Sequence, residues 1–317
     1  MQSIIENIRN SGISLKTIPK NTGLQLKRIA SILEGIEPTL AEARKLSKAL
    51  KLPLAVLLSE NVLTDINVLF RQAYKNELEN RHADKIAYTI GNALSLINHD
   101  NSHQGILQKF PALENTYSNA AYLATRFREI FCERNFIEPL LDLPQIVSEK
   151  LKFLLFVTDL GHKVDGASAI INNTPFIFIS PSFKPRMLFT LAHELGHILS
   201  HLNTQSNYVK VDNEILESLR VRSKDEGFAN AFASELLLPS EGVGITLQSL
   251  RNRFQIRGVI GDIEIIYLSR IYGVSFEVAA KRCEDLRLLP KGGAASLAEA
   301  IKKDYESPEK RAQELNI

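Results

Sequence analysis

The sequence predicts a mostly helical α+β protein with an all-α bundle at its N-terminus. Its 317 residues exceed the usual size of one domain, and a hydrophobic content of 44% is ample for packed cores. Apolar side chains follow helical spacing through most of the chain, while three short β-prone runs lie together near its middle. We therefore expect four parts, at residues 1–60, 61–116, 117–290 and 291–317.

Residues 1–60 carry the start and stop signals of five short helices, which predicts a compact bundle. Ser14 and Thr39 are candidate N-caps, and one helix is expected from Gln25 to Glu34, before Gly35. The order S-L-x-x-I-x-x-x-T-G, helix, G-x-x-P-T, helix resembles the lambda-repressor-like helix-turn-helix domain. This resemblance implies a helix in the DNA major groove that presents the following outward residues: Gln25, Lys27, Arg28 and Ser31.

Two features of this region differ from those of a typical DNA-binding helix-turn-helix domain. Pro19 falls inside the expected second helix, where an internal proline costs about 3 kcal/mol, so that helix must be kinked or shortened. The candidate recognition helix also offers only two cations, although residues 1–60 hold nine Lys and Arg against five Asp and Glu. DNA binding and protein docking therefore both stay open as roles of this region.

Residues 61–116 are expected to form a helical connector without a motif. His82, His99 and His103 lie here, and their spacing is unlike that of metal ligands. The segment from residue 117 then begins with a helix to about Arg134 and a short helix after Pro144.

The three β-prone runs predict a small sheet, and they are Phe153–Val157, Ala167–Ile171 and Phe176–Ile179. A turn at residues 172–175, N-N-T-P, separates the last two. Because an exposed edge strand can hold an extended peptide by main-chain hydrogen bonds, the sheet is a hypothesis for substrate capture.

The helix expected over Arg186–Leu202 carries the motif H-E-x-x-H at His193, Glu194 and His197. Two histidines one turn apart can both reach one zinc ion, and the glutamate between them can take a proton from a water on that ion. A third ligand is needed. His201 lies about 6 Å further along a straight helix, too far to share the ion, and is rejected.

Glu226 is the better third ligand, at the start of a second helix over Lys224–Pro239. Ala229 and Ala233 would let this helix approach the histidine helix closely, and Asn230 is a candidate partner for a ligand. Without the upstream motif, Glu226 would read as a solvated acid in a first helical turn.

The two helices together resemble the ImmA/IrrE family of metallopeptidases, over roughly residues 120–290. The shared pattern is R-x-x-F-T-L-A-H-E-L-G-H-I-L, a polar loop, then E-x-x-A-N-x-F-A-x-x-L-L-x-P. The resemblance implies a zincin-like domain in which zinc is held by His193, His197 and Glu226 while Glu194 is the general base.

Residues 203–223 between the two helices are expected to be a surface loop. Tyr208 and His201 are candidate donors to an oxyanion. Further helices are predicted at Ser240–Phe254, Asp262–Tyr272 and Ser275–Leu286, followed by a loosely attached tail after Pro290.

We expect a cytoplasmic protein with no membrane segment, because no signal peptide or long apolar run is found and the two cysteines are far apart. The predicted function is a zinc-dependent endopeptidase, whose substrate, by resemblance, is a repressor or antitoxin. One alternative is a DNA-binding transcriptional regulator with the metal domain as sensor. Another is a structural zinc site, which would have no use for Glu194 as a base.

Overall fold

A computed structural model describes residues 4–5, 8, 17–50, 54, 57, 62–74, 80–96, 109–111, 113–201, 207–213, 215 and 223–317. The chain divides into two compact units, residues 1–101 with 209–211 and residues 102–208 with 212–317. The boundaries predicted at residues 60, 116 and 290 stay predictions. No helix in the described parts is long and apolar enough to cross a membrane. His99, His103 and Ser14 lie outside the described residues.

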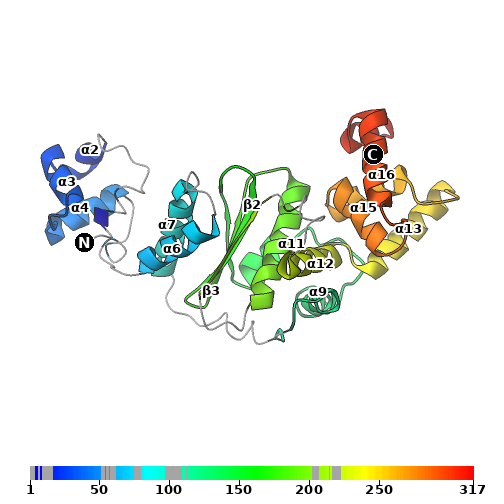
Figure 1. Ribbon diagram of the computed structural model, residues 1–317, viewed down its shortest axis with the longest axis horizontal. Helices are drawn as coiled ribbons and strands as arrows, with labels where there is room; N and C mark the ends of the chain where they lie inside the picture. The colour runs from blue at the N-terminus through cyan, green and yellow to red at the C-terminus, as the bar shows by residue number, and fades with distance from the viewer. Residues whose placement is uncertain are drawn as a thin grey trace. The chain divides into compact units, whose positions relative to one another are not determined.

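In the described part of the first unit, short helices pack around one apolar core (Figure 1). They are α2 (Ile18–Thr22), α3 (Leu26–Leu33) and α4 (Leu40–Leu50). Gly23 has φ 68°, in the left-handed region, and ends α2 three residues before α3 begins. Two longer helices, α6 (Val62–Ala73) and α7 (Asn80–Leu96), pack against each other in the same unit.

The predictions for Pro19 and for the Thr39 cap are both confirmed. Pro19 lies in the first turn of α2, where its missing N–H needs no partner, so the helix is shortened rather than kinked. Thr39 and Glu42 cap α4 reciprocally, because the backbone N–H of Thr39 donates to Glu42 Oε2 at 2.8 Å and that of Glu42 donates to Thr39 Oγ1 at 3.3 Å.

Four strands form a mixed sheet in the order β1-β3-β2-β4, and β1, β2 and β3 lie in the second unit. The strands are β1 (Leu154–Val157), β2 (Val164–Ile171), β3 (Thr174–Ile179) and β4 (Tyr208–Asn213). β1 pairs parallel with β3, and β2 pairs antiparallel with β3 in the register Ile171↔Thr174. Asn172 and Asn173, with φ of 50° and 64°, form the tight turn, so Thr174 and Pro175 already belong to β3.

β4 corrects the expectation that residues 203–223 are a surface loop. Within the described part of that segment, Tyr208–Asn213 is an edge strand of the sheet. The sequence Y-V-K-V-D-N alternates apolar and polar side chains, which is the pattern of a strand with one covered face.

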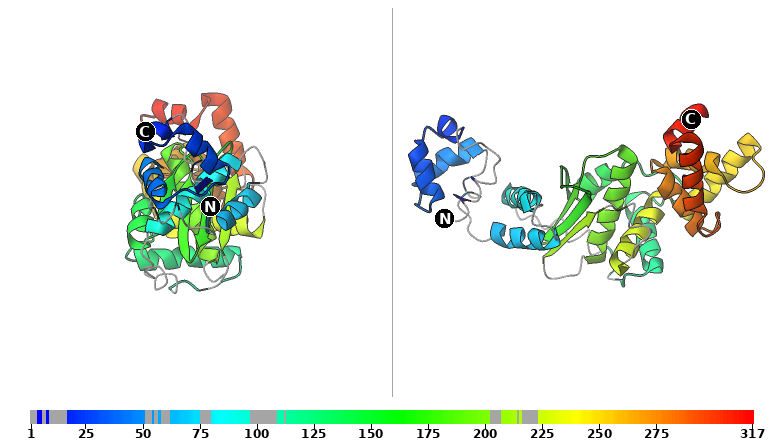
Figure 2. Two further views of the ribbon diagram at one scale, coloured as in Figure 1. Left: turned by 90° about the vertical axis from the view of Figure 1, so that its left-hand side faces the viewer. Right: turned by 45° about the horizontal axis from the view of Figure 1, so that its top comes forward.

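The sheet covers one side of α11 (Lys184–His201), and α12 (Lys224–Leu237) packs on another (Figures 1 and 2). α9 (Tyr117–Phe131) lies against α12, and the short α10 (Leu143–Gln145) leads into a π-helical turn at Ile146–Lys150. Because neighbours surround it, α11 is buried on every face from Phe189 to Leu199.

The C-terminal region is a packed helical layer. Its helices are α13 (Ser240–Phe254), α14 (Asp262–Tyr272), α15 (Phe276–Asp285), α16 (Gly293–Tyr305) and α17 (Pro308–Glu314). The expectation of a loosely attached tail was wrong, because Ile301 and Ala312 are buried in the core and Arg311 pairs with Asp262 at 2.8 Å. Burial of this apolar surface stabilises the last two helices.

Candidate metal centre

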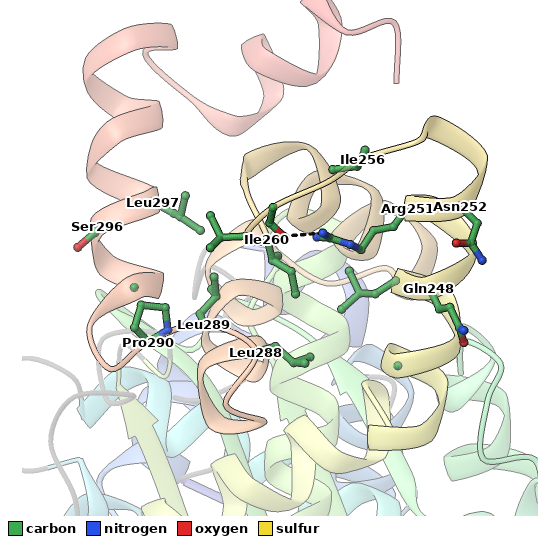
Figure 3. Close-up of a pocket in the computed structure, with 15 residues that line it drawn as sticks. Gln248, Arg251, Asn252, Ile256, Ile260, Leu288, Leu289, Pro290, Ser296 and Leu297 are labelled. Carbon is green, nitrogen blue, oxygen red and sulfur yellow. Dashed lines mark hydrogen bonds between the residues drawn. The ribbon is translucent and has the colours of Figure 1, made fainter.

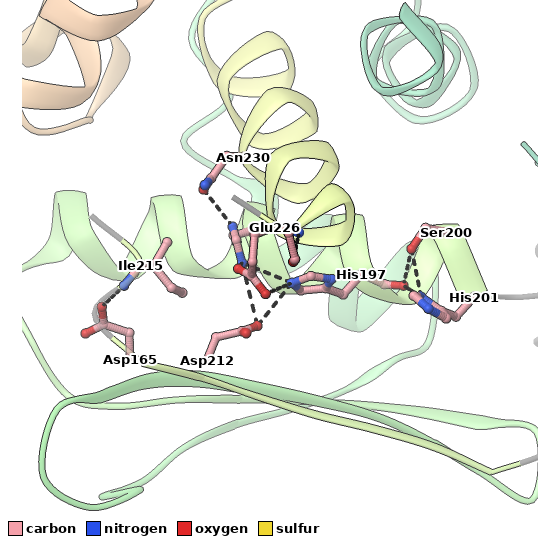
Figure 4. A network of polar contacts seen from close by, with 10 residues as sticks. Asp165, His197, Ser200, His201, Asp212, Ile215, Glu226 and Asn230 are labelled. Atoms are coloured by element: carbon pink, nitrogen blue, oxygen red, sulfur yellow. Dashed lines mark hydrogen bonds and ion pairs between the residues drawn. The ribbon is translucent and has the colours of Figure 1, made fainter. Parts of the chain in front are cut away.

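Two histidines of α11 point their Nε2 atoms at the same space, and Figure 4 shows His197 facing Asp212 and Glu226. His193 and His197 are both fully buried, and their Nε2 atoms lie 3.1 Å apart. Their rings cross at 81° with centroids 4.7 Å apart, the expected result of side chains one helical turn apart. The pair therefore offers two nitrogen ligands to one position.

Glu226 enters the same space from α12. Its Oε2 lies 3.4 Å from His193 Nε2, and its Oε1 lies 3.7 Å from His197 Nε2. The approach of the two helices depends on small residues, since a Cβ added to Gly196 of α11 would meet Cα of Ala229 at 3.2 Å. The structure thus brings together the three residues that the sequence proposed as ligands.

Asp212 of β4 is a fourth member of the cluster, and sequence reasoning missed it. Its Oδ2 lies 3.1 Å from His197 Nε2 and 3.6 Å from His193 Nε2, and the residue is 4% exposed. The ligand atoms of all four residues lie within 4.8 Å of one another. The alternation in residues 208–213 was the available signal, but an isolated acid in a polar stretch gives no ligand spacing.

Asn230 orients His193 from behind. Its Oδ1 lies 2.9 Å from His193 Nδ1, and because a carbonyl oxygen only accepts, His193 Nδ1 must be the donor. This leaves His193 Nε2 to face the cluster with its lone pair whenever that imidazole is neutral. A hydrogen bond of this kind fixes the tautomer and orientation of metal-binding histidines.

The electrostatics of the cluster favour a cation. Burial opposes ionisation, but the histidines outweigh it and lower the pKa of both Asp212 and Glu226. Burial likewise opposes a charge on His193, yet hydrogen bonds to Asp212 and Glu226 raise its pKa to about 10. Two carboxylates are thus ionised beside two imidazole nitrogens 3.1 Å apart. This donor set fits a divalent metal ion such as zinc.

Glu194 lies on α11 between the two histidines and is fully buried. Burial and, second, the charge of Asp212 raise its pKa well above the ordinary value. Among the described residues, neither oxygen of Glu194 has a hydrogen-bond partner of good geometry, and Nδ1 of His197 likewise has none. A buried carboxylate with a raised pKa beside a cluster of ligands has the properties of a general base.

The two oxyanion candidates lie beside the centre. The ring of Tyr208 on β4 stacks on His201 of α11 at 4.1 Å and 19°. Burial, with the nearby charges of Glu194 and Asp212, raises the pKa of Tyr208, so its hydroxyl keeps its proton. His201 Nδ1 is 2.9 Å from the carbonyl oxygen of His197 and is outside the ligand group, in agreement with its rejection as a ligand.

The DNA-binding candidates in α3 and its N-cap differ in exposure. Gln25 and Lys27 are exposed, while Arg28 and Ser31 are partly buried. Arg28 is partly exposed, and its guanidinium binds Glu42 through two hydrogen bonds of 2.8 and 2.9 Å and the carbonyl oxygen of Glu37 at 3.0 Å. Its charge is used within the bundle.

A separate cavity of about 830 Å³ lies among the C-terminal helices (Figure 3). Its walls are largely aliphatic, and Arg251 at its edge binds Glu264 at 2.8 Å. None of the predicted site residues lines this cavity. It is therefore no part of the metal centre.

The comparison with protein families agrees with this geometry. Residues 148–284 match the family model Peptidase_M78, described as the IrrE N-terminal-like domain. The match spans the sheet, both ligand helices and Asp212, so it includes the whole cluster. No curated protein is similar enough to count as a match. Over these residues the chain is similar to a family of metallopeptidases.

Proposed function

We propose that the protein is a zinc-dependent endopeptidase. The observation that carries the proposal is the convergence of His193, His197 and Glu226 on one position, with the buried carboxylate of Glu194 on the same helix. A structural zinc site has no need of such a base. The similarity of residues 148–284 to a peptidase family supports the same conclusion.

Each residue has a distinct role in this proposal. His193, His197 and Glu226 would hold the ion, and Asn230 would keep the ring of His193 in place. A zinc ion supplies Lewis acidity and lowers the pKa of water that it binds. Glu194 accepts a proton during attack on the peptide carbonyl and delivers it to the leaving amine.

The proposed substrate is a repressor or an antitoxin-like protein whose cleavage changes transcription. The support for this part is the resemblance to the ImmA/IrrE family together with a helical unit at the N-terminus. In this scheme residues 1–60 would bind the substrate protein or the DNA beside it.

The direct test uses full-length zinc-loaded protein and candidate repressors encoded by neighbouring genes, with fragments identified by mass spectrometry. Glu194→Gln should retain zinc and lose cleavage, since the amide cannot accept the proton. Glu226→Ala should lose zinc. Continued cleavage of a partner by Glu194→Gln would exclude Glu194 as the base.

A second candidate function is DNA-binding regulation, in which the metal domain acts as a sensor. The observation that favours it is the α2–α3 pair, two helices joined by a three-residue connection that begins with Gly23. Binding of the full chain to DNA that weakens steeply with salt would support this function. Binding absent even at low salt would favour protein docking instead.

A further inference from the structure

The ligand atoms of the four residues lie at separations that suit a four-coordinate zinc ion. Zinc with bonds of about 2.0–2.1 Å to nitrogen and oxygen places its four ligand atoms about 3.3 Å from one another. His193 Nε2 lies 3.1 Å from His197 Nε2, 3.4 Å from Glu226 Oε2 and 3.6 Å from Asp212 Oδ2. His197 Nε2 lies 3.1 Å from Asp212 Oδ2 and 3.7 Å from the other Glu226 oxygen, Oε1. All five distances lie close to the ideal value.

A catalytic zinc site differs from this arrangement in one respect. Such sites hold zinc with three protein ligands and keep the fourth position for water or substrate. Here Asp212 takes that fourth position, and it is 4% exposed. In this centre, Asp212 therefore takes the position that water or substrate takes in a catalytic zinc site.

Asp212 is the ligand with the weakest structural support. His193 and His197 belong to the central helix α11, and Glu226 belongs to α12, which is in direct contact with α11 through Gly196 and Ala229. Asp212 instead belongs to β4, which forms an edge of the sheet. An edge strand is hydrogen-bonded to one strand only, so it can separate from the sheet at a lower cost than an inner strand can.

Besides the pairing of β4 with β2, the described residues show one contact from β4 to α11 and one from the segment after β4 to β2. Tyr208 stacks on His201 four residues before Asp212, and Asp165 accepts a 2.8 Å hydrogen bond from the backbone N–H of Ile215 three residues after it (Figure 4). Asp165 is in turn held by Arg186 through bonds of 3.0 and 2.8 Å. Both contacts are non-covalent, so binding of a partner can break them.

We infer that Asp212 is a removable fourth ligand that keeps the metal centre closed, and that a substrate reaches the ion only when β4 moves Asp212 away. This inference deepens the proposed peptidase function and rests on it. The incoming group is the carbonyl of an extended peptide. Its oxygen replaces the carboxylate oxygen of Asp212, and an extended chain can pair with the same sheet by main-chain hydrogen bonds.

The test measures access to the metal without measuring activity. Full-length protein is loaded with Co²⁺, its stoichiometry is determined, and acetohydroxamate is added while the visible absorption bands of the ion are recorded. The wild-type spectrum should stay unchanged. Asp212→Ala should bind Co²⁺ and show a saturable shift of its bands, because the small chelator now reaches the ion.

Two further variants make the result specific. Asp212→Asn keeps the volume of the side chain, replaces a good ligand by a poor one, and should also respond if the alanine variant fails to fold. Asp225→Ala is the matched control, since this neighbouring acid is bonded to Asn115 at 2.7 Å and is outside the ligand group. It should behave like the wild type.

The failures of the inference and of the proposed function are distinguishable. Wild-type protein that binds Co²⁺ and responds to acetohydroxamate as strongly as Asp212→Ala would overturn the inference and leave the metal centre intact. Folded Asp212 variants that bind Co²⁺ without a response would also overturn it. Wild-type protein that binds neither Co²⁺ nor Zn²⁺ would overturn the proposed function.

Discussion

Gly166 of β2 lies directly against the carboxylate of Glu194 of α11. A methyl group at residue 166 would overlap that carboxylate and would lie 2.8 Å from Cγ2 of Thr190. The sheet can thus cover α11 closely only because this residue has no side chain. Packing of the fold and placement of the proposed base depend on the same glycine.

Gly166→Ala should therefore displace Glu194 and reduce cleavage by about a hundredfold, the scale of loss for a catalytic group misplaced by about 1 Å. Zinc content should stay close to that of the wild type, because no ligand is touched. Rates of peptide cleavage and metal analysis measure the two effects. Gly244→Ala is the control, since a Cβ there meets nothing within 4 Å. An unchanged rate in Gly166→Ala would contradict the prediction.

Removal of the Asn230 side chain should weaken zinc binding. Asn230→Ala takes away the acceptor for His193 Nδ1, and the loss of such a partner typically lowers metal affinity 10–100-fold. Asn230→Asp keeps an acceptor at the same place and should bind at least as tightly as the wild type. Competition with a chromophoric chelator gives the affinities. Equal affinities for Asn230→Ala and wild type would show that the contact is unimportant.

Metal binding at pH 8 should release a proton. The pKa of His193 is raised to about 10 by Asp212 and Glu226 against the effect of burial, so the metal-free protein carries that proton at pH 8. A ligating imidazole must be neutral. Calorimetric titrations with zinc in buffers of different ionisation enthalpy measure the proton count. Enthalpies that do not depend on the buffer would count against the protonated state.

The same histidine sets a pH dependence of stability in the metal-free protein. Its pKa is about 10 in the folded state against 6.5 as the ordinary value, so its contribution is complete below pH 6.5 and is lost as the pH rises through 10. The melting temperature of the metal-free protein should fall over this range. A His193→Gln variant should show a smaller decline, and an equal decline in both would assign the effect to other groups.

Alanine substitutions of Arg28 and Lys27 should have different effects on the stability of the N-terminal unit and on DNA binding. Arg28→Ala removes both bonds to Glu42 and the bond to the carbonyl oxygen of Glu37, so it should lower the free energy of unfolding. Lys27→Ala changes an exposed side chain and should leave stability unchanged while reducing any DNA binding. Urea denaturation and DNA titrations at several salt concentrations provide the measurements. A larger stability loss for Lys27→Ala would reverse the assignment.

The periodic parts of the fold were predictable because local sequence determines them. The runs that became β1, β2 and β3 are rich in aromatic and β-branched residues, and the Asn172–Asn173 turn suits left-handed backbone. α13 and α14 begin and end where their spacing and flanking residues predict. The three candidate ligands could be identified from the sequence. His193 and His197 are one helical turn apart, and Glu226 begins the next helix.

Asp212 could not be found in this way, because its role depends on sheet pairing. Val209 and Val211 alternate with polar residues, but the segment has few apolar side chains and reads as a loop by composition. Only the addition of β4 beside β2 brings Asp212 to the histidines. The tail after Pro290 was misjudged for a similar reason, since the surface that buries Ile301 comes from distant residues.

The position of β4 at the edge of the sheet also affects how the purified protein should be handled. An ion at the centre would cross-link this strand to α11 and α12 through Asp212, whereas a chelator would leave it held by weaker contacts. A released edge strand exposes the backbone groups of its neighbour to other chains and promotes aggregation. Storage buffers for this protein should therefore contain zinc and omit EDTA, and light scattering after chelation should report the onset of self-association.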